Sequence, residues 1–140
     1  NTAGTQLFSA YCKLKGKNYL RQVLSVFFTR LMQRRDALEV DPARCKEEDA
    51  AANSLELFEL VNEILDKIFQ SQSQLPQCMG RLFFHLHKMV HDKYPDIGSK
   101  IAGGFFFLRF LCPMALSPDV YNLVDSKVTA STRRSLILCT

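Results

Sequence analysis

The chain has 140 residues, 47% of them hydrophobic and 23% charged, which supplies enough apolar material for one folded domain and argues against a disordered segment. Its formal net charge of +4, from 18 basic and 14 acidic residues, is modest beside the dense basic footprint of a dedicated nucleic-acid binder. An acidic protein surface suits this charge as well as a phosphate backbone does.

Cysteine usage and the first residues bear on where the protein works. The cysteines are odd in number, widely spaced and without a CxxC pair, which argues against a cysteine-based zinc site and for free thiols in a reducing, cytoplasmic compartment. The opening NTAGTQLF lacks the basic start and apolar core of a signal peptide and has no initiator methionine, so we expect a fragment of a longer protein. The cysteines are Cys12, Cys45, Cys78, Cys112 and Cys139.

The first half of the chain predicts helices. Apolar residues recur at helical spacing between residues 7 and 32, and we expect Gly16 to separate two helices there. Residues 38–54 form a polar connection, in which Asp41 and Pro42 have the residue types of an N-cap followed by proline at the first helical position. The acidic group at 47–49 suits an early helical turn.

The second half continues the helical pattern. Further helices are expected from about 77 to 94, through the apolar run before Pro113, from Ser117 to Val124, and from 129 onwards. With no strand or hairpin pattern, the prediction is a single all-α, irregular multi-helix domain over 1–140. The clearest helix is 54–70, where an apolar stripe is formed by Leu55, Phe58, Val61, Leu65, Ile68 and Phe69.

Two features look like catalytic motifs but lack essential parts. His87 and His91 have the i, i+4 spacing of zinc ligands, but Lys88 replaces the glutamate of HExxH, so we interpret them as surface histidines and expect no metal. Gly103 and Gly104 lack the phosphate-loop pattern, and glycine inside a helix costs about 1 kcal/mol relative to alanine. We expect close approach of a neighbouring helix or a bound partner there.

Basic residues occur in small groups, which we interpret as solvated faces because no aromatic residues are interleaved as in a single-strand binder. These are Lys13, Lys15, Lys17 and Arg21, then Arg34 and Arg35, then Arg133 and Arg134.

Arg109 is unusual because it interrupts the run FFFLRFL. An unpaired charge in an apolar setting costs several kcal/mol, so the side chain must reach the edge of the core or meet specific acceptors. Pro113 is expected to stop the helix four residues later. Arg109 then either satisfies the carbonyls of the last helical turn or holds a neighbouring loop by donating to its backbone carbonyls. The same run, IAGGFFFLRFLCPMAL, spans about 16 residues, short of the roughly 20 that cross a bilayer, so we expect no membrane insertion.

The segment GFFFLRFLCPMALSP (104–118) resembles the FLR-x-x-x-PA-x-x-x-P signature of Ras GTPase-activating proteins. Phe107, Leu108 and Arg109 match FLR, and Pro113 and Pro118 match the two prolines, whereas Met114 stands where the family generally has alanine. GKNYL (16–20), KYPD (93–96) and RRSLIL also match in order, and LEVDPAR (38–44) is similar to neurofibromin-like members. The resemblance covers essentially the whole chain and implies the all-α catalytic core.

The resemblance also assigns roles to residues. Asn1 and Thr2 match the second half of the loop that carries the family's arginine finger, which places the finger arginine two residues before Asn1. Arg109 would stabilise that loop through its main-chain carbonyls, and Leu108 would line the GTPase-binding groove. Lys100 and Arg134 are candidates for the basic lining of this groove. Because the finger would be missing, we expect these 140 residues alone to activate poorly.

The function implied by the resemblance is stimulation of GTP hydrolysis by a GTP-bound, Ras-type small GTPase, which negatively regulates Ras signalling. The protein would act as a monomer with no active site or cofactor of its own, since GTP and magnesium belong to the partner, and flanking domains would recruit it to membranes. One alternative is a scaffold of the same fold that binds the GTPase without accelerating hydrolysis. A helical interaction domain or basic nucleic-acid binder unrelated to GTPases is the other.

Overall fold

The computed structural model describes residues 2–140, and within that range it contains helices and turns but no strand, which confirms the all-α prediction. A short 3₁₀ turn, η1 (Gln72–Gln74), and a π-helical segment, η2 (Phe105–Leu111), join the α-helices. The α-helices are α1 (Ala3–Val23), α2 (Ser25–Gln33), α3 (Glu47–Gln70), α4 (Gln77–His91), α5 (Gly98–Gly104), α6 (Cys112–Leu116) and α7 (Ala130–Cys139).

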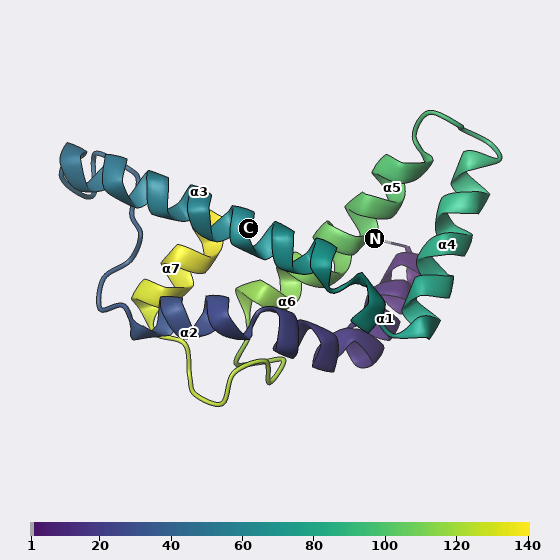
Figure 1. Ribbon diagram of the computed structural model, residues 1–140, viewed down its shortest axis with the longest axis horizontal. Coiled ribbons are helices and arrows are strands. Elements are labelled where there is room, and N and C mark those ends of the chain that lie inside the picture. Colours follow the sequence, from purple (N-terminus) through teal and green to yellow (C-terminus); the bar gives the residue numbers. More distant parts are fainter. Residues whose placement is uncertain (1) are drawn as a thin grey trace.

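The helices form an elongated, irregular assembly (Figure 1). α3 runs along one long edge, α2 lies on the opposite edge, and α7 packs against both of them. At the other end α4 and α5 form a helical hairpin. α1 contacts α2, α3, α4 and η2, so it connects the hairpin end to the rest of the molecule.

Helix α1 is continuous through Gly16, contrary to the predicted break at this glycine. Gly16 is buried, and a Cβ atom built on it would lie 2.2 Å from Cζ of Phe110 and 2.7 Å from Sδ of Met79. The glycine is therefore needed for close packing of η2 and α4 against α1. The break comes instead at Leu24, where the backbone has φ −94° and ψ 4°.

The connection between α2 and α3 is a turn rather than the start of a helix, so the prediction for Asp41 and Pro42 is wrong. The Asp41 carboxylate accepts a hydrogen bond from the Ala43 amide at 2.9 Å, and the chain then reaches Lys46, the N-cap of α3. The acidic residues at 47–49 do lie in the first turn of α3, as predicted.

The apolar stripe predicted on α3 is only partly correct. The side of α3 that faces the core carries Leu57, Leu60 and Ile68, whereas Leu55, Phe58 and Phe69 are each more than 60% exposed. With the partly buried Ile64, the core-facing side has spacings of three and four residues, and so does the predicted stripe through Val61 and Leu65, so periodicity could not decide which side is buried.

The segment after α6 is also not helical where the short helix from Ser117 to Val124 was predicted. Asn122 adopts a positive φ of 52°, which ends any right-handed helix at this position. Asp119 organises the loop, because its carboxylate accepts hydrogen bonds from the amides of Val120 and Val128 and from Arg133. Pro118 is fully buried beneath this loop.

The helix that carries the FLR motif runs without interruption from Gly98 to Leu116. By length and composition alone it could cross a membrane, and 22% of its most apolar window is buried inside the protein. It packs against α1 and α4 through its first two segments and against α7 through α6.

A candidate GTPase-binding groove beside a π-helical turn

Pro113 does not stop the motif helix, because the backbone widens into a π-helical turn just before it. The Cys112 amide donates to the Phe107 carbonyl, five residues back, instead of to the carbonyl four residues back. Pro113 then occupies the first turn of α6, where its missing amide is tolerated. The prediction that Arg109 lies in the last turn of a helix is therefore wrong, since it lies in the middle of one.

A second helix meets the backbone of the motif at this turn. The Ser9 hydroxyl of α1 donates a 2.8 Å hydrogen bond to the Arg109 carbonyl. In a regular α-helix that carbonyl would accept from the amide of residue 113, which proline does not have.

Around this hydrogen bond lies a polar groove of about 380 Å³ between α1 and the motif. Its two cationic residues are Lys13 and Arg109, and the Arg109 side chain is exposed. Lys13 is held by Tyr121, whose hydroxyl lies 3.0 Å from Nζ and whose ring centroid lies 5.0 Å from it. The remaining lining residues are Thr5, Gln6, Ser9, Ala10, Leu108 and Pro113.

Leu108 forms a ridge between this groove and an apolar hollow on its other side. Its side chain is 67% exposed and lines both depressions. The hollow, about 220 Å³, is lined mainly by apolar residues of α3 and of the motif helix, together with Cys139 and Thr140 at the end of α7. Leu108 is thus a large apolar side chain presented to solvent beside two cations, as expected for a contact residue.

The opposite side of the motif helix is anchored in the core by aromatic packing. Phe110 is fully buried, and its ring makes an edge-to-face contact with Phe106 at 5.6 Å between centroids. Phe107 is half-buried and contacts Phe106 in the same way at 5.3 Å. These contacts fix which residues of FFFLRFL point inward and leave Leu108 and Arg109 outside.

Two further predicted site residues, Thr2 and Lys100, are not part of the groove lining. Asn1 lies outside the described residues. Thr2 is the N-cap of α1, and its hydroxyl accepts from the Thr5 amide at 3.3 Å. Thr5 in turn lines the groove. Lys100 is exposed on the first turn of α5, two helical turns before Leu108 and outside the groove lining.

Arg134 makes an ion pair within the protein. Its guanidinium binds both oxygens of Glu39 at 2.9 Å, and the Glu39 side chain is only 13% exposed. Hydrogen bonds from Arg134 and from the amides of Asp41 and Val40 outweigh the effect of burial and lower the pKa of Glu39 to about 2. The arginine fastens the 38–45 loop to α7, and its proposed place in the groove stays a prediction.

Several other basic residues are also engaged, so the interpretation of all basic groups as solvated faces is wrong in part. Arg34 binds both oxygens of Glu56 at 2.8 Å. Arg133 donates to the Leu116 carbonyl at 3.0 Å and to Asp119. The Asp119 pKa is lowered because bonds from Val128, Arg133 and Val120 outweigh the effect of burial, which alone would raise it.

The two glycines and the two histidines of the hairpin have different surroundings. A Cβ on Gly103 or Gly104 would meet no atom within 4 Å, so the prediction of a neighbouring helix there is wrong. A bound partner remains the predicted reason for these glycines. His87 approaches the Ser99 hydroxyl at 3.2 Å and His91 the Pro95 carbonyl at 3.0 Å, so both fasten the α4–α5 turn.

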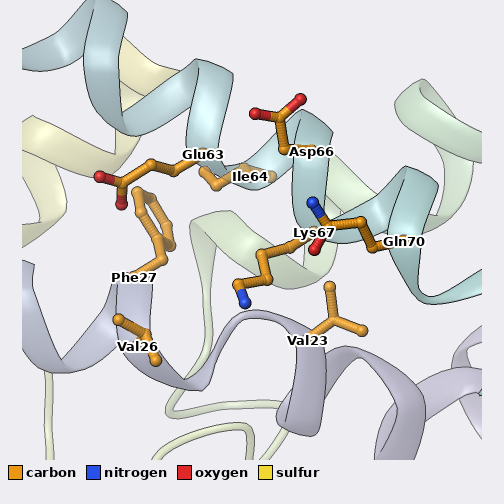
Figure 2. A pocket seen from close by; sticks show the side chains of 8 residues that line it. All are labelled: Val23, Val26, Phe27, Glu63, Ile64, Asp66, Lys67 and Gln70. Carbon is orange, nitrogen blue, oxygen red and sulfur yellow. The ribbon is translucent and has the colours of Figure 1, made fainter.

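Elsewhere, a pocket of about 240 Å³ lies between α3 and the junction of α1 with α2. Figure 2 shows Val23, Val26 and Phe27 on one side and the α3 residues Glu63, Ile64, Asp66, Lys67 and Gln70 on the other. It has no nucleophile paired with a base. Within residues 2–140 no three His, Cys, Asp or Glu side chains gather as metal ligands do. The cysteines are free thiols, and burial raises the pKa of Cys12 and of Cys139 to about 11.

Sequence reasoning missed the α1 side of the groove, which contributes Thr5, Ser9 and Lys13. These residues recur every four positions and so form one polar stripe on the helix. That stripe, together with the missing amide of Pro113, is the signal that could have located them.

A family model described as GTPase-activator protein for Ras-like GTPase matches residues 46–140. The inhibitory regulator protein IRA2 of Saccharomyces cerevisiae is 33% identical over 126 residues, which cover 89% of this chain and 4% of that protein. The human Ras GTPase-activating protein 1 is 27% identical over 98% of this chain and 14% of its own length. The human Disabled homolog 2-interacting protein is 30% identical over 99% of the chain and 12% of its own length. The chain belongs to the Ras GTPase-activator family and spans a small part of the length of these relatives.

Proposed function

We propose that the protein stimulates GTP hydrolysis by a GTP-bound Ras-like GTPase and so negatively regulates Ras signalling. The observation that carries this proposal is the placement of the FLR motif. Leu108 and Arg109 line one groove together with Thr5, Ser9 and Lys13 of α1. The family match and the names of the human and yeast relatives support the same activity.

The mechanism assigns the chemistry to the partner and the positioning to this chain. Charge builds on the β- and γ-phosphates of GTP during hydrolysis, and an inserted arginine stabilises it, which in Ras with its activator is worth about 10⁵-fold. Arg109 would donate to the carbonyls of the finger loop and hold the finger in its productive place. Preorganisation of this kind matters because a misplacement of about 1 Å can cost on the order of 10²-fold.

The other parts of the proposal rest on the resemblance to the family. The protein has no active site or cofactor of its own, with GTP and magnesium supplied by the GTPase. It works as a cytoplasmic monomer without membrane insertion or nucleic-acid binding. Lys13, Arg109 and Lys100 would steer association with an acidic GTPase surface, so the association rate should fall with added salt.

Single-turnover GTP hydrolysis by a purified Ras-like GTPase, with and without the full-length protein, tests the proposal. We expect acceleration that saturates with protein concentration. Saturable binding without acceleration would instead establish the scaffold alternative. The absence of both would remove the GTPase as a partner, and steeply salt-dependent binding to DNA or RNA would then favour a nucleic-acid binder.

A further inference from the structure

We propose that Ser9 is a positioning residue for the FLR motif. Its hydroxyl takes the place of the backbone amide that Pro113 lacks and so fixes Leu108 and Arg109 against the first turns of α1. This inference rests on the proposed function, because its effect on the motif is measured as stimulation of GTP hydrolysis.

The first step concerns the backbone at the proline. The π-helical turn brings the Cys112 amide to the Phe107 carbonyl, and Pro113 has no amide to offer the carbonyl of Leu108 or of Arg109. Of the two, the Arg109 carbonyl receives the Ser9 hydroxyl at 2.8 Å, an ordinary distance for a strong O–H···O hydrogen bond. A side chain 100 positions away thus completes the helix at the residue whose placement matters most.

The second step concerns the two walls of the groove. Ser9 lies one helical turn from Thr5 and one from Lys13, and all three line the groove together with Leu108 and Arg109. The Ser9 hydrogen bond therefore joins the α1 wall directly to the motif wall. This hydrogen bond fixes the axial position and the rotation of the motif helix relative to α1. It thereby fixes where Arg109 lies relative to the start of α1, which is the preorganisation that the proposed mechanism requires.

A purely structural role for this hydrogen bond has a different consequence. Loss of stability would lower the amount of folded protein, whereas loss of position lowers the turnover of the bound GTPase. Ser25 supplies a matched control, because its hydroxyl also donates to a backbone carbonyl, that of Gln22 at 2.9 Å, but at the start of α2 and outside the groove.

The experiment measures kcat and KM for GTPase stimulation by full-length wild type, Ser9→Ala, Ser9→Thr and Ser25→Ala. We expect Ser9→Ala to lower kcat about tenfold, the ratio that corresponds to about 1.4 kcal/mol, with KM changed less than about twofold. Ser9→Thr keeps the hydroxyl and should retain wild-type kcat, and Ser25→Ala should leave both constants unchanged.

A second arm uses Pro113→Ala, which supplies an amide that can donate to the Arg109 carbonyl. In this background Ser9 becomes redundant, so adding Ser9→Ala should lower kcat less than about twofold. Amide hydrogen exchange of residues 106–114, which does not depend on the GTPase, should be faster in Ser9→Ala than in wild type.

Each result decides the inference. Provided that the wild type is active, the inference is overturned if Ser9→Ala is equally active, or if Ser9→Ala and Ser25→Ala lose activity equally. It is also overturned if Ser9→Ala changes KM alone, or if Ser9→Ala lowers kcat as much in the Pro113→Ala background as in the wild type. A wild type that does not accelerate hydrolysis would overturn the proposed function, and with it the catalytic role of Ser9. Unchanged hydrogen exchange in Ser9→Ala would in addition refute its structural basis.

Discussion

The loop at residues 38–45 and the groove beside the FLR motif differ in how their polar groups are placed: those of the loop are paired inside the fold, whereas the groove is open to solvent. In the loop, Glu39 binds Arg134 through both carboxylate oxygens, its carbonyl accepts from Asn53, and the buried Leu38 amide donates to Ser135. In the groove, Leu108 is 67% exposed, and the Ser9 hydroxyl joins the two walls by donating to the Arg109 carbonyl.

The difference separates polar groups that hold the fold from side chains that lie exposed on the wall of a groove. Each region contains an arginine with a predicted role in the GTPase site, Arg109 as the stabiliser of the finger loop and Arg134 as part of the basic lining of the groove. The structure pairs Arg134 with the carboxylate of Glu39, whose side chain is 13% exposed, and places the exposed Arg109 side chain in the lining of the groove. Stability and activity should therefore respond to different substitutions, which can be tested in order of expected effect.

A large loss of stability is expected from Gly16→Ala, which places a methyl group 2.2 Å from Cζ of Phe110 behind the motif. Overpacking of this kind costs about 1–3 kcal/mol, so the free energy of unfolding in denaturant should fall by that amount. Gly80→Ala is the matched control, because a Cβ there meets nothing within 4 Å and alanine favours the helix by up to about 1 kcal/mol. Equal stability of the two variants would show that Gly16 is not a packing requirement.

Arg109→Ala should lower GTPase stimulation at least tenfold, equivalent to about 1.4 kcal/mol of transition-state stabilisation, with only a mild loss of binding. Its exposed side chain predicts little change in unfolding. Single-turnover hydrolysis on the full-length protein measures the loss, and Arg109→Lys tests whether the planar fork is required. A folded Arg109→Ala variant with full activity would remove this arginine from the mechanism.

The Glu39 pair should give the loop an acid-sensitive contribution to stability. The folded pKa of about 2 lies below the ordinary value of 4.5, so the contribution is fully present above about pH 4.5 and is lost as the pH falls toward 2. Denaturant unfolding as a function of pH should show this fall in wild type and a shallower one in Glu39→Gln. Identical slopes for the two proteins would mean that the pair does not stabilise the fold.

The smallest effect on stability is expected from Leu108→Ala, because an exposed side chain usually changes unfolding by no more than about 0.5 kcal/mol. Leu111→Ala, three residues further along the same segment and only 6% exposed, should cost about 2–5 kcal/mol. Affinity for the GTPase should fall more in Leu108→Ala than in Leu111→Ala when the loss of affinity in each variant is divided by its loss of stability. A large destabilisation by Leu108→Ala would place this residue in the core.

Sequence predicted the helical class and located the motif, because helical periodicity and the FLR signature are local. It failed where a distant segment decides the outcome. Gly16 reads as a helix breaker until Phe110 is brought against it, and Pro113 reads as a stop until Ser9 and the wider turn accommodate it. On α3, two stripes with the same spacing differ only in what packs on them.

The π-helical turn also has a consequence for the length of the motif. An α-helix advances by about 100° per residue, and the widened turn holds one residue more than a regular turn would. Because the widened turn absorbs that residue, removing one residue from Phe105–Leu111 would return the backbone to a regular helix and leave α5 and α6 in phase. Removing one residue from the regular part of the helix, between Gly98 and Gly104, would instead rotate everything upstream by roughly that angle relative to α6.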